Sequence, residues 1–503
     1  MSVALPFDLT GIKLDAGRKR SEQLYRALRE KMVNTPGLHG AKLPATRELA
    51  RLLGVSRNTV VSVYERLYAD DLIETRQGDG TYIRYRGQEV DEGPDVPEIP
   101  ALRVDSRLPL TARFNRHFVH DGPPKAFRIG MPAIDHFPFD TWSRLQNRFW
   151  RRRPIAQMGY GVPAGDLQLR ELIASYLHTS RGLKCDPAQV IITLGAQQAI
   201  MLCSALLLRV GQDVIMENPC HWAAAGVFSC LGLNIKAINV DDEGLQTAQL
   251  TDYPDARMVY VSPSCQYPTG ATLSLSRRMT LLEWARKHQA WIMEDDYDGE
   301  YRYNGTPLMP LAALDNRHRV IYIGSFSKVM YPALRLGYMV VPQQLVEPLN
   351  LLRTLSTRQP PMNDQQVMAS FISEGHFQPH IRRMRRISKS RRDLLLAEWN
   401  QHLSHIGVMP EVASGLHAAI TLDDAETETR LVSQAQAAGV EITPLSALWI
   451  PGTPESRHHY GVVLGFAGVM EADIVQSIQA LKNAGSDPAK MNHQRISTNA
   501  FAL

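Results

Sequence analysis

The stretch VIYIGSFSK, Val320 to Lys328, decides the fold of the larger part of this chain. Its first four residues form an unbroken apolar run, which predicts a strand buried on both faces. A lysine at the carboxyl end of a parallel strand lies at the edge where α/β sheets bind ligands. Burial there lowers the pKa of an amine, so Lys328 becomes a candidate nucleophile toward an aldehyde. Lysines after strands more often face solvent, and the assignment therefore depends on the motifs around it.

Similar apolar runs recur on both sides of this stretch and alternate with helical patterns, as expected for a mainly parallel α/β sheet. The runs are VIIT (190–193), DVIMEN (213–218), MVYVSP (258–263), WIMED (291–295) and GYMVVP (337–342). After about residue 350 the pattern becomes helical and then mixed, which indicates a second lobe.

Polar residues at the ends of these runs point to one cofactor, pyridoxal phosphate. Asp295 and Tyr297 end a buried strand, where an aspartate can keep the pyridine ring nitrogen protonated and a phenol can bond the 3-hydroxyl oxygen. The segment 193–198 follows VIIT and opens a helix, whose backbone N–H groups and dipole suit a phosphate. Ser325, Ser327 and Arg335 lie close enough to Lys328 in sequence to bind that phosphate too.

Together with YGVPAG (160–165) and SPSCQYPTG (262–270), these motifs resemble fold-type I pyridoxal-phosphate enzymes, the aspartate aminotransferase superfamily, from about Phe127 to Lys482. The resemblance implies that Lys328 forms the Schiff base, that Asp295 pairs with the ring nitrogen and that Tyr297 bonds the 3-hydroxyl. It also implies a homodimer, in which Tyr160 reaches the phosphate of the neighbouring subunit. The predicted cofactor-binding residues are Ala196, Gln197, His221, Tyr267, Asp295, Tyr297, Ser325, Ser327, Lys328, Arg335 and Tyr160.

Two positions depart from the superfamily pattern. His221 stands where an aromatic residue, often tyrosine, stacks on the pyridine ring, and Val463 stands where amino-acid-binding relatives carry an arginine that pairs with the substrate carboxylate. Without that arginine the chain is not expected to bind an α- or γ-amino acid in the usual way. The effector would then be pyridoxal phosphate itself or an amino compound, with Arg457 and His417 as alternative carboxylate partners.

Basic charge is concentrated at the amino terminus. Residues 1–86 carry 15 Lys and Arg against 10 Asp and Glu, whereas the remaining residues carry 40 against 41. Such a module suggests contact with a polyanion, the alternative being a basic surface without a partner.

The same module has the pattern of a helix–turn–helix. We expect helices over 21–32, from an N-cap at Thr46 to Leu53, and after a cap at Ser56, where Val60, Val63, Tyr64 and Leu67 form a buried stripe. The first turn of the third helix presents residues 57–59 outward, toward base edges in a major groove. Residues 72–76 and 81–84 flank the turn QGDG (77–80) and predict a β-hairpin wing.

This winged helix resembles the amino-terminal domain of GntR-type regulators, and its fusion to an aminotransferase-like domain resembles the MocR/GabR family of bacterial transcription regulators. The predicted fold is thus an α+β winged helix–turn–helix followed by an α/β fold-type I domain. The resemblance implies operator DNA as a partner. The predicted DNA-binding residues are Arg47, Ser56, Arg57, Asn58, Thr59 and Gly80.

The predicted organisation is a DNA-binding domain over 1–86, a linker over 87–125 that contains six prolines, an aminotransferase-like domain over 126–490 and a polar tail over 491–503. Five cysteines without a CxxC pair, no visible export signal and no apolar run long enough for a membrane span predict a cytoplasmic protein. Arginines and a lysine crowd a predicted helix over 382–392, which is either a solvated face or a surface that docks DNA or the winged helix of the partner subunit.

The favoured function is a pyridoxal-phosphate-dependent, DNA-binding transcription regulator that senses an effector at the Lys328 site and is not primarily an enzyme. One alternative is an aminotransferase with an accessory DNA-binding domain, since the catalytic residues are all present. The other is a cofactor-free scaffold with a vestigial pocket.

Overall fold

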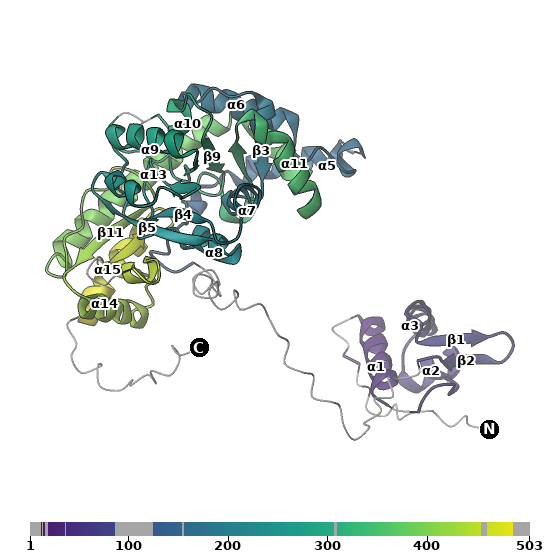
Figure 1. The fold of residues 1–503 in the computed structure, drawn as a ribbon. Coiled ribbons are helices and arrows are strands. Elements are labelled where there is room, and N and C mark those ends of the chain that lie inside the picture. Colours follow the sequence, from purple (N-terminus) through teal and green to yellow (C-terminus); the bar gives the residue numbers. More distant parts are fainter. Residues whose placement is uncertain are drawn as a thin grey trace, which may run out of the picture. The chain divides into compact units, whose positions relative to one another are not determined.

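The computed structural model describes residues 12, 14–15, 19–35, 37–85, 124–152, 155–305, 309–453 and 460–485. The chain divides into two compact units, residues 1–103 and 104–503 (Figure 1). Most of the predicted linker, up to residue 123, and the whole predicted tail lie outside the described residues.

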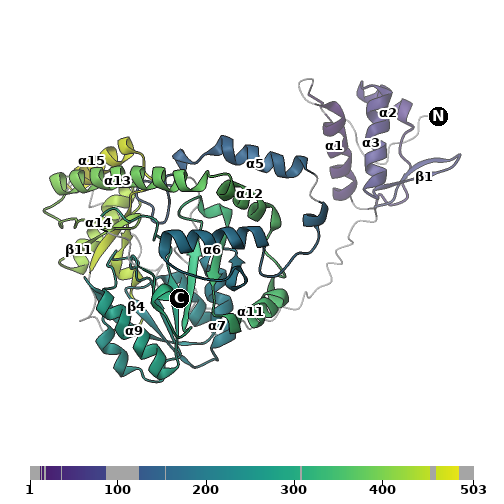
Figure 2. The same cartoon turned by 90° about the horizontal axis from the view of Figure 1, so that it is seen from above.

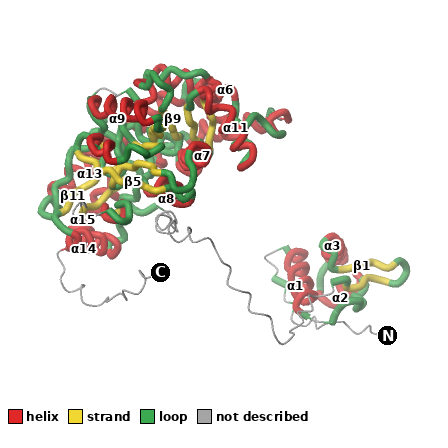
Figure 3. The backbone as a smooth tube through the Cα atoms, viewed as in Figure 1, coloured by secondary structure: helices red, strands yellow, loops and turns green. Residues whose placement is uncertain are grey.

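The first unit is a winged helix–turn–helix (Figure 3). Helix α3 packs against α1 and α2 and buries the predicted stripe of Val60, Val63, Tyr64 and Leu67. The strands β1 and β2 form an antiparallel hairpin. The bounds are α1 (Arg20–Asn34), α2 (Thr46–Leu53), α3 (Arg57–Ala69), β1 (Ile73–Arg76) and β2 (Gly80–Ile83).

The turn between α2 and α3 is set by local chemistry. Gly54 ends α2 in the left-handed conformation, with φ +64°, and the Ser56 hydroxyl accepts a hydrogen bond from the backbone N–H of Thr59 at 3.1 Å. The prediction of a Thr46 cap was wrong. The extended backbone ends at Ala45, so Thr46 is the first helical residue and α2 has no side-chain cap.

The second unit is built on an eight-stranded sheet in the order β3-β10-β9-β8-β7-β4-β5-β6. Strands β9, β8, β7, β4 and β5 are parallel, whereas β10 runs antiparallel to both β3 and β9. The bounds are β3 (Val190–Thr193), β4 (Asp213–Asn218), β5 (Asn234–Asp241), β6 (Gly244–Leu245), β7 (Met258–Val261), β8 (Trp291–Asp295), β9 (Val320–Ser325) and β10 (Gly337–Val340). The mainly parallel sheet predicted from the apolar runs is confirmed.

Helices cover both faces of this sheet, which explains why its strands are apolar throughout. One face packs against α7 (Ala196–Leu207) and α8 (Trp222–Cys230). The other packs against α6 (Leu167–Arg181), α12 (Met362–Ser373) and α9 (Leu275–His288). The helices α5 (Phe139–Arg151), α10 (Leu311–Leu314) and α11 (Gln343–Ser356) complete this lobe.

A smaller lobe follows in sequence, with a three-stranded antiparallel sheet in the order β11-β13-β12. The long helix α13 packs against α15 beside this sheet (Figure 2). The bounds are α13 (Phe377–His402), β11 (His417–Leu422), α14 (Ala425–Ala437), β12 (Thr443–Pro444), β13 (Tyr460–Gly465) and α15 (Glu471–Gly485).

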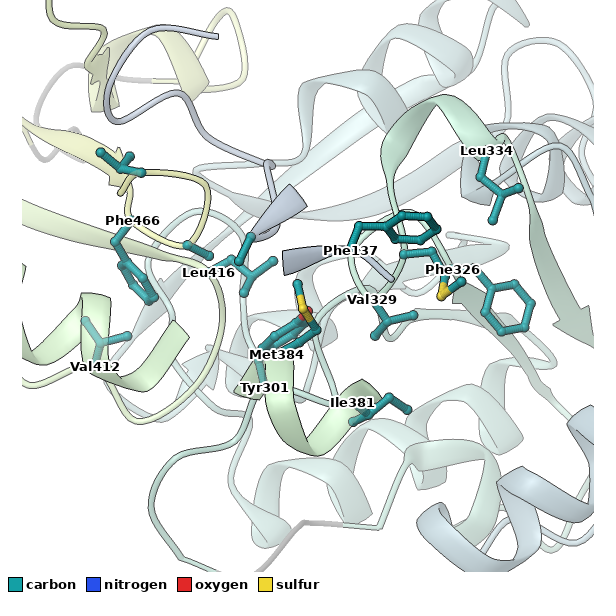
Figure 4. Close-up of a cluster of buried hydrophobic side chains, with 14 of the residues drawn as sticks. Phe137, Tyr301, Phe326, Val329, Leu334, Ile381, Met384, Val412, Leu416 and Phe466 are labelled. Carbon is teal, nitrogen blue, oxygen red and sulfur yellow. The ribbon is translucent and has the colours of Figure 1, made fainter. Parts of the chain in front are cut away.

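The loop that carries Lys328 is anchored in the hydrophobic core between the two lobes. Phe326 and Val329, on either side of the lysine, lie in one buried cluster with Met384 of α13 and Leu416 and Phe466 of the smaller lobe (Figure 4). The Tyr301 hydroxyl also donates to the Lys328 carbonyl oxygen at 2.8 Å. Contacts with the core therefore fix the backbone around Lys328, while its amine faces a cavity.

Candidate functional site

A cavity of about 420 Å³ opens at the carboxyl ends of β8 and β9 and the amino terminus of α7. Ten predicted cofactor-binding residues line it, although they come from six separate segments of the chain. They are Ala196, Gln197, His221, Tyr267, Asp295, Tyr297, Ser325, Ser327, Lys328 and Arg335.

Tyr160, the remaining predicted cofactor-binding residue, does not line the cavity and is 83% exposed. The guanidinium carbon of Arg358 lies 4.5 Å from the centre of its ring.

The Lys328 amine lies at the inner wall of the cavity and donates to the carbonyl oxygen of Gly130 at 2.9 Å. Desolvation lowers the pKa of this amine, while the carboxylates of Asp298 and Asp295 act in the opposite direction. A lowered pKa increases the fraction of neutral amine, the form that attacks an aldehyde. Gly130 has φ +80°, and a Cβ there would lie 2.8 Å from the Lys328 nitrogen, so only glycine permits this approach.

The two carboxylate oxygens of Asp295 differ in their hydrogen bonds within the described part of the chain. The Tyr260 hydroxyl donates to its Oδ2 at 2.6 Å, whereas its buried Oδ1 has no hydrogen-bond partner among the residues that the structure describes. Burial raises the pKa of Asp295 to about 6, although the bond from Tyr260 lowers it. A buried acceptor without a partner is costly, so Oδ1 is suited to receive the N–H of a protonated pyridine ring.

The phosphate end of the site is the amino terminus of α7. No side chain in the described part of the chain caps this helix, so the N–H groups of its first turn are available to an anion. Gly195, with φ +87°, brings the backbone to the Arg335 guanidinium, which donates to the Leu194 carbonyl oxygen at 2.9 Å. The Ser325 hydroxyl lies beside them and accepts from the N–H of Ser327 at 3.1 Å. These groups fit the phosphate of pyridoxal phosphate.

His221 lies in the wall of the cavity next to two tyrosines. Its ring is nearly parallel to that of Tyr260, at 6.4 Å between centres, and meets the edge of Tyr267 at 5.5 Å. Desolvation lowers the pKa of His221 to about 4, so the imidazole is neutral at physiological pH. A neutral ring can stack on a pyridine as an aromatic side chain would.

Tyr260 and Asp298 are among the residues of the site that the sequence analysis missed. Tyr260 lies in the middle of strand β7, where its hydroxyl could not be distinguished from an ordinary core phenol. Asp298 lines the cavity, and burial raises its pKa to about 7. Its Oδ2 accepts from the N–H of Leu416 at 3.3 Å. The acidic run EDDYD (294–298) was the available signal for Asp298.

The structure also places the residues considered for carboxylate binding. Val463 is fully buried in β13. His417 lines the cavity, but desolvation lowers its pKa to about 4. Its Nε2 lies 3.0 Å from the Pro268 carbonyl oxygen, which makes that nitrogen the donor and leaves Nδ1 as an acceptor. His417 therefore has no charge to offer a carboxylate. Arg457 lies outside the described residues.

The basic run over 382–392 is largely structural, which neither sequence interpretation anticipated. The side chain of Arg391 is fully buried and pairs with Asp135, and Arg392 donates to the Val412 carbonyl oxygen. Arg385 likewise donates to the carbonyl oxygen of Glu300. Arg382, Arg386 and Lys389 remain exposed.

In the first unit, the predicted DNA-binding residues occur at the start of two helices and at the wing. Arg47, Ser56, Arg57 and Asn58 are exposed, and Thr59 is half-buried. Gly80 begins β2 after the turn, and a Cβ there would lie 2.7 Å from the side chain of Lys42.

Comparisons with known proteins assign a family to each of the two units. A model of bacterial regulatory proteins of the gntR family matches residues 20–83, and a model of aminotransferase classes I and II matches residues 146–454. The chain is 34% identical over 472 residues to the "Probable rhizopine catabolism regulatory protein MocR" of Rhizobium meliloti, covering 93% of this chain and 94% of that protein. This chain belongs to the MocR family of transcription regulators.

Other relatives of this MocR-family regulator include the pyridoxine biosynthesis transcriptional regulator PdxR of Corynebacterium glutamicum, which is 30% identical and covers 89% of this chain and 90% of its own length. Among solved structures, a kynurenine aminotransferase of Pyrococcus horikoshii matches with a TM-score of 0.66 and 26% identity, covering 76% of this chain and 95% of that one. The expected fold-type I domain is thereby confirmed. None of the described helices of this regulator is both long and apolar enough to cross a membrane.

Proposed function

We propose that this regulator holds pyridoxal phosphate in the cavity, binds operator DNA through its winged helix and changes its DNA affinity when an effector occupies the cavity. The observation that carries the proposal is the convergence of Lys328, Asp295, Arg335 and the uncapped start of α7 on one cavity. When bound, pyridoxal phosphate supplies an aldehyde that combines reversibly with primary amines.

Different residues of the cavity bind different parts of the cofactor. Arg335, Ser325, Ser327 and the first N–H groups of α7 hold the phosphate. Asp295 would accept a hydrogen bond from the protonated ring nitrogen, and the desolvated Lys328 amine would hold the aldehyde end of the cofactor. The effector is either pyridoxal phosphate itself or an amine that competes with Lys328 for that carbon.

In the winged helix, Arg57 and Asn58 project from the first turn of α3 and reach base edges, while Arg47 and the wing contact the backbone. A tenfold to hundredfold effect of the effector on DNA affinity corresponds to about 1.4–2.7 kcal/mol of coupling free energy.

The regulator is proposed to act as a cytoplasmic homodimer on repeated operator half-sites. Large apolar side chains are exposed close together in sequence, with Trp150, Ile155, Met158, Tyr160 and Val162 each more than half exposed. Exposed apolar clusters of this kind mark protein interfaces.

The test uses the purified full-length chain with pyridoxal phosphate added. The wild-type protein should show a visible absorbance band that is absent in Lys328→Ala, and amines or excess cofactor should change its affinity for promoter DNA. An identical spectrum in Lys328→Ala would refute the cofactor site. Sustained transamination at about 1 s⁻¹ or faster, with no effect on DNA binding, would favour an aminotransferase instead.

A further inference from the structure

The described part of the second unit begins with the segment 124–131, and residues 128–131 of this segment line the cavity. The Ala126 carbonyl oxygen accepts from the N–H of Glu441 at 3.0 Å, and that of Phe127 accepts from the N–H of Gly465 at 2.9 Å. Three residues further on, the Gly130 carbonyl oxygen accepts from the Lys328 amine. The segment thus connects the smaller lobe directly to the reactive lysine.

Arg128, in the middle of this segment, forms an ion pair with Glu441. Its Nε donates to Glu441 Oε2 at 2.8 Å, and both residues line the cavity. The side chains of Arg128 and Glu441 are 12% and 21% exposed, so the pair is largely shielded from solvent. Charge-assisted hydrogen bonds in such partly shielded places are strong enough to select a ligand.

Three cations line the cavity among the described residues: Lys328, Arg335 and Arg128. The first two have roles toward the cofactor. Val463 contributes only an apolar surface within the core, and His417 is neutral. Arg128 is therefore the cation of the described cavity wall that remains for an anionic group of an effector.

We propose that Arg128 recognises a carboxylate on the effector, and that the ligand carboxylate replaces Glu441 as the partner of Arg128. The effector is then a primary amine that also carries a carboxylate. Glu441, with about a fifth of its side chain exposed, turns to water when it is displaced. This inference rests on the proposed function, because the amine must reach the same cavity.

The two members of the pair should respond in opposite directions when each is made neutral. Arg128→Gln removes the group that binds the ligand carboxylate. Glu441→Gln removes the competitor and leaves Arg128 available. A pair that served only to hold the two lobes together would weaken binding in both variants, so the sign of the second effect separates recognition from structure.

The experiment titrates the full-length, pyridoxal-phosphate-loaded protein and follows its visible spectrum. The probes are the ω-amino acids from β-alanine to 6-aminohexanoate, each against the n-alkylamine of equal chain length. In the wild type, at least one amino acid should bind about tenfold more tightly than its alkylamine. Arg128→Gln should reduce this preference to about twofold or less, and Glu441→Gln should increase it.

Arg277→Gln is the matched control. Arg277 is also a partly shielded arginine in an ion pair, with Asp241, but it does not line the cavity. The control should keep the wild-type preference. If the alkylamines bind as tightly as the amino acids, or if Glu441→Gln weakens binding of the amino acids, the inference is wrong while the proposed function stands. If no amine changes the spectrum, the inference is wrong, and the proposed function stands only in the form in which pyridoxal phosphate itself is the effector.

Discussion

The hydrogen bond from Tyr260 to Asp295 offers the sharpest test of how this site works. Tyr260→Phe removes one hydroxyl from a side chain that is only 2% exposed and leaves the ring in place. The hydroxyl donates to Asp295 Oδ2 at 2.6 Å and stabilises the ionised carboxylate. Its removal should therefore raise the pKa of Asp295 above its present value of about 6.

The size of the change follows from the strength of such a bond. A hydrogen bond to a charged group contributes about 1.5–3 kcal/mol, which corresponds to about one to two pKa units. The pKa of Asp295 would then move from about 6 to roughly 7–8. At pH 7 the ionised fraction falls from about 90% to roughly 10–50%, so the carboxyl can no longer hold a protonated ring nitrogen reliably.

The assay measures the dissociation constant of pyridoxal phosphate between pH 5.5 and 9 for both proteins. As the pH falls, Asp295 takes up a proton and cofactor binding weakens, and in Tyr260→Phe this should occur about one to two pH units higher. At pH 9 the variant should approach the wild type. Lys328 titrates in both proteins, so its contribution to the pH dependence cancels when the two dissociation constants are compared at each pH.

Tyr322→Phe is the matched control, because the Tyr322 hydroxyl donates to Asp296 at the same distance of 2.6 Å. Asp296 does not line the cavity and also pairs with Arg181. In Tyr322→Phe, the pH dependence of pyridoxal phosphate binding should follow that of the wild type. If Tyr260→Phe loses affinity equally at every pH, or not at all, the assignment of Asp295 as the ionised partner of the ring is wrong.

Three further variants test other parts of the structure. Arg57→Ala should weaken promoter binding by about 1–3 kcal/mol in a fluorescence anisotropy titration, with unchanged cofactor loading; equal affinity would remove Arg57 from the DNA-contacting set. Arg391→Ala should lower the free energy of unfolding by about 3 kcal/mol in a denaturant titration, because it removes a fully buried arginine that pairs with Asp135 and donates to the Ala467 carbonyl oxygen, whereas the exposed Arg386→Ala should change it by less than about 0.5 kcal/mol. Gly195→Ala should weaken pyridoxal phosphate binding by about 1 kcal/mol or more, measured by equilibrium titration, because φ +87° is unfavourable for alanine; unchanged affinity would mean that the turn is not part of the cradle.

Much of the fold and of the candidate site could be predicted from short stretches of sequence. The run VIYI followed by GSFSK identified a buried strand and a lysine at its end, because strand burial and strand termination are both set by residues within a few positions. The Ser56 cap and the stripe on α3 were predicted for the same reason. The predicted cofactor residues lie at strand ends and a helix start, and in a parallel sheet such ends converge on one edge.

What the sequence alone left undecided depends on contacts between distant residues. Arg128 and Glu441 are 313 positions apart, and no local pattern indicates that they meet. From the sequence, the arginines of α13 are expected to form a solvated face of the helix. In the structure, however, Arg391 is buried and pairs with Asp135, which lies 256 positions earlier in the chain. Periodicity reports which side of an element is apolar, but the partner of a buried charge is chosen by the packing of the whole chain, and only the tertiary structure contains that information.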